Sequence, residues 1–409
     1  MVSHRGVRTL ILLGLSGCLT TIFTVTLNTG TAAQVRLAPL PAQPPAPPDN
    51  PSTPERVALG RLLFWDPILS GQKDVACATC HHPAFGYSDG LDLSIGASGA
   101  GLGPARAFAA GHAARPVKRN SQTVLNVAFN GLTADGPAAA TGAPMFWDSR
   151  VHSLEAQALE PLKAVDEMRG SAYTEDRALA AAVSRLNAIP EYRRLFAAAF
   201  GESSTVSERN LGRALAAFQR TLVASNTPFD RYMRGDQAAL DAEQLRGMER
   251  FQSIGCINCH SGPMFSDFKT HVLAVPDNQK LSESDSGVNK TYAFRTASLR
   301  NLSVTAPYMH SGVFASLQDV VNFYQRISGG RGGRGGGGGR GGPGGGGPRG
   351  TNPLVDRDQI DPLARQLNMR GRGQQDLIAF LRALDDPGFD RTVPTRVPSG
   401  LAVGGILTR

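Results

Sequence analysis

The sequence has no long run of alternating apolar and polar residues, which is the pattern that half-buried strands produce. A sheet of any size is therefore excluded. Hydrophobic residues still make up 41% of the 409 residues, so the chain can bury a sizeable core and is not disordered as a whole. Apolar residues recur at helical spacing over 211–222 and 377–384, and residues 191–200 and 317–326 also have helical patterns. The predicted fold class is mostly α with long irregular loops.

An excess of one charge sign is also missing from most of the chain, although the formal net charge is +8. Residues 1–33 carry two arginines and no acidic residue, and the tract 329–350 carries four arginines among sixteen glycines. Because these arginines account for most of the excess, the remaining body is close to neutral and no nucleic-acid partner is expected. The tract 329–350 cannot bury a core, so we predict a disordered, solvated insertion there.

The first 33 residues have the organisation of a secretory signal peptide. Two arginines precede an apolar run over residues 10–27, and Thr31-Ala32-Ala33 offers the small residues of a cleavage site. Two alternatives stay open. The run is long enough to remain as a membrane anchor, and Cys18 stands in a segment similar to a lipoprotein processing site. In each case the folded part lies outside the cytoplasm, and we predict a periplasmic protein.

Cysteine is scarce, and four of the five cysteines stand in Cys-x-x-Cys pairs that are each followed by histidine. The two segments are Cys77-Ala-Thr-Cys80-His81 and Cys256-Ile-Asn-Cys259-His260. This is the attachment sequence of c-type haem: two thiols reach the two vinyl groups, and the adjacent histidine becomes an iron ligand. A redox pair rarely occurs twice, and zinc lacks histidines at finger-like spacing. We therefore predict two covalently bound haem c groups, with His81 and His260 as iron ligands, rather than disulfides or zinc.

The two motifs lie 179 residues apart, so each is expected to mark its own domain. Similar sequences precede them at 59–64 and 246–251, as an internal duplication of a helical cytochrome c unit would produce. We predict two cytochrome-c-like haem domains. The predicted boundaries are a signal peptide at 1–33, a Pro-rich extended linker at 34–54, an N-terminal haem domain at 55–225, a C-terminal haem domain at 226–390 that contains the Gly/Arg tract, and a tail at 391–409.

Several segments between residues 54 and 386, outside the glycine tract, resemble bacterial di-haem cytochrome c peroxidases and their MauG-type relatives, in the order expected for that family. The matching segments are Leu59-Gly60, Leu63-Phe64, Asp66-Pro67, Leu69-Ser70, Arg119-Asn120-Ser121, Thr123-Val124-Leu125-Asn126, Phe146-Trp147-Asp148, Phe229-Asp230-Arg231, Phe294-Arg295-Thr296, Leu299-Arg300-Asn301, Thr305-Ala306-Pro307-Tyr308-Met309-His310 and Gly312. The resemblance implies that the haem at His81 meets hydrogen peroxide, while the haem at His260 stores and relays electrons.

The resemblance also implies roles for three residues in the reaction with peroxide. Trp147 matches the tryptophan that lies between the two haems, and Gln157 and Glu167 match the glutamine and glutamate of the peroxide pocket. A desolvated carboxylate has a pKa raised towards neutrality, which suits the transfer of a proton from one peroxide oxygen to the other. A neutral amide orients peroxide without adding charge. The alternative is that Gln157 and Glu167 are exposed residues of an ordinary helix and that Trp147 is a core aromatic residue.

Distal iron ligands also follow from the resemblance. His112 matches the distal histidine that peroxidases carry at the first haem, with an unligated loop histidine as the alternative. At the second haem, Tyr324 stands where peroxidases have methionine and MauG-type proteins have tyrosine, and a tyrosinate ligand stabilises oxidised iron. The alternative ligands there are Met309, His310 and Met369.

A calcium ion between the haem domains is implied as well. Asn120, Thr305 and Pro307 match the residues that hold it in the family, the last two through their backbone carbonyls. Oxygen ligands of this kind suit calcium.

We predict a di-haem c-type peroxidase that reduces hydrogen peroxide to water with electrons from a small redox protein, a cytochrome c or a cupredoxin. A homodimer is compatible with this function. The alternatives are a MauG-type oxidase that oxidises side chains of a partner protein, which Tyr324 favours, and a di-haem electron carrier without catalysis. His112 favours the peroxidase. The set of Trp147, Gln157 and Glu167 argues against the carrier, since electron transfer alone does not need it.

Overall fold

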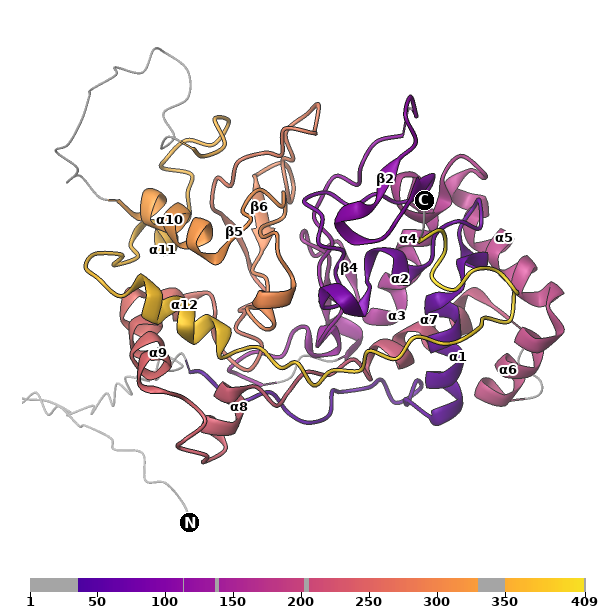
Figure 1. The fold of residues 1–409 in the computed structure, drawn as a ribbon, viewed down its shortest axis with the longest axis horizontal. Helices are drawn as coiled ribbons and strands as arrows, with labels where there is room; N and C mark the ends of the chain where they lie inside the picture. The colour runs from indigo at the N-terminus through magenta and orange to yellow at the C-terminus, as the bar shows by residue number, and fades with distance from the viewer. Residues whose placement is uncertain (1–35, 113, 137–139, 202–205, 330–349, 408–409) are drawn as a thin grey trace, which may run out of the picture. The chain divides into compact units, whose positions relative to one another are not determined.

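The computed structural model describes residues 36–407, apart from residue 113 and residues 137–139, 202–205 and 330–349. The predicted signal peptide and almost all of the Gly/Arg tract lie outside the described residues. Within these residues helices dominate, and strands form only three short antiparallel pairs (Figure 1). The prediction of a mostly α fold without a sizeable sheet is therefore confirmed. No helix in this part of the chain combines the length and the apolar character that a membrane span requires.

The elements follow one another with long irregular connections. The helices are α1 (Pro54–Trp65), α2 (Cys77–Cys80), α3 (Leu154–Gln157), α4 (Glu160–Lys163), α5 (Glu175–Ala188), α6 (Pro190–Phe200), α7 (Glu208–Gln219), α8 (Pro228–Met233), α9 (Ala242–Ile254), α10 (Leu317–Ser328), α11 (Pro362–Arg365) and α12 (Gln374–Arg382), with a π-helical turn at Val165–Arg169. The strands pair as β1 (Gly99–Ala100) with β2 (Ala107–Phe108), β3 (Pro144–Met145) with β4 (Val151–His152), and β5 (Thr270–Val272) with β6 (Ala293–Arg295).

Two helix pairs cross in the same way, with a glycine at each crossing. α1 packs on α7 at Gly60, where a Cβ atom would lie 2.0 Å from the carbonyl oxygen of Ala214. α9 packs on α12 at Gly247, where a Cβ atom would lie 1.9 Å from the carbonyl oxygen of Asp376. Only glycine permits so close an approach of two backbones. The two glycines belong to the similar sequences that precede the two Cys-x-x-Cys-His motifs.

The helices around the second motif share an aromatic core. The rings of Phe229, Phe251, Phe265 and Phe380 pack on one another at centroid distances between 5.1 and 6.1 Å. Arg300 lies beside this core, and its guanidinium donates two hydrogen bonds, at 2.8 and 2.9 Å, to the fully buried carboxylate of Asp230 on α8. Its Nε atom also donates to the carbonyl of Pro263 at 2.7 Å. The chain that follows Cys-x-x-Cys-His is thereby fixed to the helices.

The C-terminal segment returns to the first motif. Figure 1 shows it as a yellow irregular segment that leaves α12 and runs past α7 and α1. The amide of Gly404 donates to the carbonyl of Trp65 at 2.8 Å, and its carbonyl accepts a hydrogen bond from the Thr79 hydroxyl at 2.7 Å. The amide of Ile406 donates to the carbonyl of Asp74 at 2.9 Å. Since Thr79 lies between the two cysteines of the motif, the tail braces the first attachment sequence directly.

Candidate functional site

A single continuous cavity of about 870 Å³ receives side chains from both Cys-x-x-Cys-His segments. It brings together most of the residues that the sequence singled out. Those that line it are Cys77, Cys80, His81, Asn120, Trp147, Gln157, Glu167, Cys256, Cys259, His260, Thr305, Pro307, Met309, His310, Tyr324 and Met369. His112 is not among the lining residues.

The first motif presents a histidine with one free ring nitrogen. Cys77–Cys80 form the short helix α2, and His81 follows at its C-terminal end. Its Nδ1 atom lies 3.2 Å from the carbonyl oxygen of Tyr87 and 3.4 Å from the Ser121 hydroxyl. With the proton on Nδ1 donated to that carbonyl, Nε2 keeps its lone pair for a metal. Burial lowers the pKa of His81 to about 4, so the imidazole is neutral at physiological pH.

The second motif repeats this arrangement. The Nδ1 atom of His260 lies 2.9 Å from the carbonyl oxygen of Phe265, five residues further along the chain. Burial lowers the pKa of His260, as it does at the first motif. A backbone carbonyl that fixes the tautomer is the usual support of a metal-bound histidine. Both histidines are therefore prepared to bind iron through Nε2.

The four cysteines of the motifs are all free thiols. Burial raises the pKa of Cys77 and of Cys256 to about 12, and it raises the pKa of Cys80 as well. These groups stay protonated at neutral pH, unlike the thiolates of a reactive redox pair or of a zinc site. Two free thiols and one neutral histidine at each end of a large cavity are the groups that a c-type haem requires. The donor set thus fits two haem groups.

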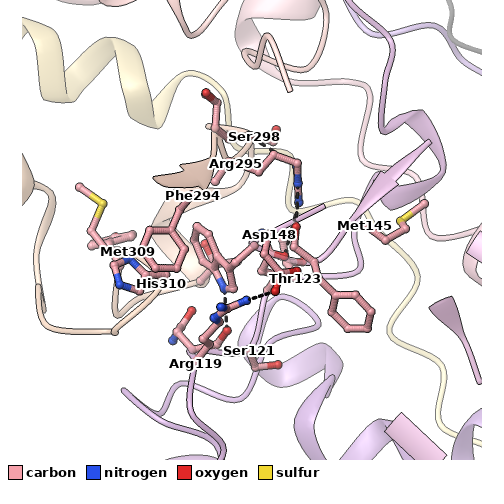
Figure 2. A pocket seen from close by; sticks show the side chains of 18 of the residues that line it. Arg119, Ser121, Thr123, Met145, Asp148, Phe294, Arg295, Ser298, Met309 and His310 are labelled. Atoms are coloured by element: carbon pink, nitrogen blue, oxygen red, sulfur yellow. Dashed lines mark hydrogen bonds and ion pairs between the residues drawn. The ribbon is translucent and has the colours of Figure 1, made fainter. Parts of the chain in front are cut away.

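Trp147 lines the same cavity as both motifs. Its indole Nε1 donates to the carbonyl of Asn120 at 3.0 Å, and its ring meets the imidazole of His310 edge-on at a centroid distance of 6.4 Å. His310 in turn stacks on Phe294 at 3.5 Å, nearly parallel (Figure 2). Burial lowers the pKa of His310 to about 3, so this stack is uncharged. Aromatic rings therefore continue from Trp147 to β6.

An ion-pair cluster borders this aromatic stack. Arg119 lies 5.3 Å from the centre of the Phe294 ring and donates to Asp285 at 2.6 and 3.1 Å and to Asp148 at 2.7 Å (Figure 2). Burial alone would raise the pKa of Asp285, but the hydrogen bonds and charge of Arg119 lower it to about 2. Sequence reasoning missed Asp285, because it stands in a long loop without any motif around it.

Gln157 and Glu167 both line the cavity, from two neighbouring elements. Gln157 ends α3, whereas Glu167 stands in the π-helical turn. Within the described chain, neither side chain has a hydrogen-bond partner, so both remain available to a ligand. Burial raises the pKa of Glu167, and the nearby charge of Arg150 opposes this only in part. A carboxyl group with a raised pKa is better suited to accept and return a proton than an exposed one.

Tyr324 and Met369 share one apolar cluster with Cys256. Burial raises the pKa of Tyr324 above its usual range, and the electrostatic interaction with Cys259 raises it further. Tyr324 also packs on a second apolar cluster, together with Met309, and His310 is held in the stack with Phe294. The clusters thus place Tyr324 and Met369 with Cys256 but do not separate Met309 from Tyr324, and the choice of Tyr324 as ligand stays a prediction.

His112 lies on an exposed turn after β2, away from the cavity lining. Its ring stacks on Phe108 at 5.7 Å, and its Nδ1 atom accepts a hydrogen bond from the amide of Ala114 at 2.9 Å. The structure therefore does not bring His112 together with His81. Its role as a distal ligand stays a prediction that requires this turn to move.

The three residues of the implied calcium site line the cavity together. The Asn120 amide nitrogen donates to the carbonyl of Leu91 at 2.8 Å, which leaves its Oδ1 atom free. Neither Thr305 nor Pro307 uses its carbonyl as an acceptor from any residue that the structure describes. Oxygen atoms of this kind suit a hard cation, and the calcium ion stays a prediction.

A helical protein with two haem-attachment sequences on one cavity belongs to the class of di-haem oxidoreductases. The family model for di-haem cytochrome c peroxidase matches residues 54–238. The methylamine utilization protein MauG of Methylorubrum extorquens is 35% identical over 377 residues, which are 90% of each chain. The cytochrome c551 peroxidase of Pseudomonas aeruginosa is 34% identical over 71% of this chain and 77% of its own. The chain therefore belongs to the di-haem cytochrome c peroxidase and MauG family, and it is an oxidoreductase of the cytochrome c peroxidase type.

Solved structures agree with this assignment. A MauG-like protein associated with microbial copper homeostasis superposes with a TM-score of 0.64 at 27% identity, over 85% of this chain and 95% of its own. The di-haem peroxidase BthA of Burkholderia thailandensis shares the fold, with a TM-score of 0.62 over 90% of this chain and 95% of its own. The resemblance noted in the sequence is confirmed at the level of the family.

Proposed function

We propose that this chain is an exported di-haem peroxidase with two cytochrome-c-like domains, at 55–225 and 226–390. Haem c is attached through Cys77 and Cys80 in the first domain and through Cys256 and Cys259 in the second. Peroxidase relatives and the two repeated histidine sites support this proposal. The observation that carries it is the half-buried carboxyl of Glu167, which has no hydrogen-bond partner among the described residues and lines the same cavity as His81.

When bound, the two haems supply the iron that binds peroxide and the reservoir from which electrons are delivered. The remaining work falls to side chains of this protein. Glu167 takes the proton from one peroxide oxygen and returns it to the other, and the amide of Gln157 orients the molecule by a hydrogen bond. Trp147 carries electrons between the two sites, and the hydrogen bond from its indole to the carbonyl of Asn120 holds the ring in one orientation. A small cytochrome c or cupredoxin supplies the electrons, and calcium at Asn120, Thr305 and Pro307 ties the two domains together.

The Glu167→Gln variant tests this function. Removal of a general acid–base group lowers turnover by about 10²–10⁴-fold, so we expect a loss of peroxide turnover in this range while both haems stay attached. Because the carboxylate form is needed and its pKa is raised, activity of the unmodified protein should rise with pH through that pKa, and this dependence should vanish in the variant. Steady-state assays with haem counting provide both measurements.

Glu160→Gln is the matched control for this experiment. Glu160 also lines the cavity, but Lys163 neutralises its carboxylate at 2.6 Å. We expect this variant to keep the turnover and a pH profile of the same shape, moved to lower pH because the charge of Glu160 contributes to the raised pKa of Glu167. Unchanged turnover in Glu167→Gln would contradict the proposal.

A MauG-type oxidase is the second candidate, and two observations favour it. Tyr324 lies beside the second motif, and His112 lies outside the cavity, so no histidine of that loop covers the first site. In this function the electrons come from side chains of a partner protein instead of a small redox protein. Optical and EPR spectra with peroxide, before and after addition of one electron per molecule, separate the two. A fully oxidised protein that reacts at once supports the oxidase, and reaction only after half-reduction supports the His112-gated peroxidase.

A further inference from the structure

The π-helical turn that carries Glu167 is unusual because its backbone is supported from outside the helix. A π turn contains more residues than an α turn, so it is rare and needs compensation from its surroundings. Here the carbonyl of Glu167 accepts a hydrogen bond from the amide of Ala97 at 2.7 Å, and the carbonyl of Met168 accepts one from the amide of Gly71 at 2.8 Å. Two separate loops therefore hold two consecutive peptide groups of the turn.

The same loops approach the turn more closely than side chains allow. A Cβ atom on Gly96 would lie 2.2 Å from the carbonyl oxygen of Asp166 and 2.4 Å from that of Glu167. A Cβ atom on Gly71 would lie 1.9 Å from the carbonyl oxygen of Arg169. Neither glycine has a positive φ, so neither is required for its backbone conformation. What requires glycine at these positions is the contact with the π turn.

Two arginines fix the loops in turn. Arg106 is buried and donates to the carbonyls of Ile95 at 2.6 Å and Gly96 at 2.8 Å. Arg185 of α5 donates to the carbonyl of Gly71 at 2.7 Å. The loops are also tied to each other, since the amide of Ser98 donates to Asp74 at 2.7 Å. The support of the turn is therefore rigid on both sides.

We propose that the loops 70–72 and 95–98 form a socket for the π turn and that Gly71 and Gly96 are positioning residues for Glu167. This inference rests on the proposed function of Glu167. Successive residues of a helix point about 100° apart, so relaxation of the turn towards α-helical geometry would turn this carboxyl group away from the peroxide. The socket prevents that relaxation.

Gly96→Ala tests the socket, with Gly142→Ala as its matched control. Gly142 also lacks a positive φ, but a Cβ atom there would meet no atom within 4 Å. Because a displacement of about 1 Å costs roughly 100-fold in rate, we expect Gly96→Ala to lose turnover on this scale and to lose the pH dependence assigned to Glu167. Both haems should remain, and the control should match the unmodified protein. If Gly96→Ala does not accumulate with two haems, Arg106→Lys replaces it, because it loosens the same loop without a clash.

A double-mutant cycle with Glu167→Gln shows whether the socket acts through that residue. Groups that work as one unit are not additive, so Gly96→Ala should cause no further loss in the Glu167→Gln background. Losses that multiply would overturn the proposal, since they would place the effect of Gly96 elsewhere. Turnover and a pH profile of Gly96→Ala equal to those of the control would overturn it as well.

An infrared titration separates this inference from the proposed function. The carboxyl band that disappears in Glu167→Gln reports the ionisation of Glu167 without any turnover. In Gly96→Ala its apparent pKa should fall towards the ordinary value, because the displaced turn exposes the group, and in Gly142→Ala it should not change. If Glu167→Gln retains full activity, the proposed function of Glu167 fails, but the infrared band still tests the socket. An apparent pKa of this band that is unchanged in Gly96→Ala would overturn the socket.

Discussion

Both proposed iron ligands are prepared by a single backbone contact. The Nδ1 atoms of His81 and His260 each face a carbonyl oxygen a few residues further along the chain, at 3.2 and 2.9 Å. The first cysteine of each motif, Cys77 or Cys256, stays neutral because burial raises the pKa of its thiol to about 12. The residue-scale chemistry of attachment is thus contained in short segments, and it is repeated because the segments are repeated.

One charged histidine lies beside the second motif. His271 lies between Asp267 at 3.0 Å and Asp361 at 2.6 Å, next to Cys259. Hydrogen bonds to Asp267, and then to Cys259, raise the pKa of His271 to about 11. The folded state therefore holds this proton more tightly than the unfolded chain does. Its contribution to stability is fully present below the ordinary pKa of 6.5 and is lost as pH rises through about 11.

We accordingly expect His271→Gln to be less stable than the unmodified protein at pH 6, because it lacks the charged bridge between two aspartates. In the holoprotein the sulfur of Cys259 is bonded to haem, so the two aspartates raise the pKa of His271, and the difference should shrink as the pH rises from 6.5 through that raised pKa. Urea unfolding of the holoprotein at a series of pH values measures it. A difference that is independent of pH would mean that His271 contributes packing alone.

At the scale of elements, close helix crossings position both motifs. Gly60 and Gly247 allow α1 to meet α7 and α9 to meet α12 at backbone contact. The second crossing is followed at once by Cys256, so the angle of α9 sets the direction in which the attachment sequence leaves the helix. The π turn at Val165–Arg169 belongs to this scale too, because it is stable only against the loops that hold it.

Alanine at either crossing should force the helices apart. Overpacking costs roughly 1–3 kcal/mol, and we expect Gly60→Ala and Gly247→Ala to lower the free energy of unfolding by this amount or more. Each should also reduce haem content at its own motif more than at the other. Denaturant unfolding and mass spectrometry of haem-bearing peptides measure the two effects. Equal losses at both motifs from one substitution would argue against separate crossings.

At the scale of the whole molecule, the first and the last residues that the structure describes contact segments that are remote in sequence. Leu37 pairs with Gly262 near the second motif, whereas Asn50 donates to Glu155 of α3 at 2.8 Å. The last described residues brace α1 and the helix that carries Cys77 and Cys80. The predicted linker and tail are therefore structural parts of the fold.

Deletion of residues 399–409 should weaken the first site selectively. The deletion removes the bonds from Gly404 to Trp65 and Thr79, and from Ile406 to Asp74. We expect a lower melting temperature and a loss of haem at the first motif, with the second motif fully occupied. Haem counting on separated peptides provides the measurement. Ser399→Ala is the control, because it removes the hydroxyl's hydrogen bonds with Asp66 and with the amide of Leu401 but keeps the contacts of Gly404 and Ile406. Full haem occupancy of the first motif after the deletion would show that the tail stabilises the protein as a whole but does not support the first motif in particular.

The sequence by itself determined the mostly α class and the family, and it predicts the haem-attachment chemistry, because each depends on local spacing. Cys-x-x-Cys-His works through neighbours in the chain, and the helical periods of residues 191–200 and 317–326 reappear as α6 and α10. The exposed position of His112, the partners of Arg119 and the socket around Glu167 were decided only by the tertiary structure. Each of these depends on contacts between segments tens to hundreds of residues apart. Such contacts leave no period or spacing in the chain, because they are selected by the packing of the folded molecule as a whole.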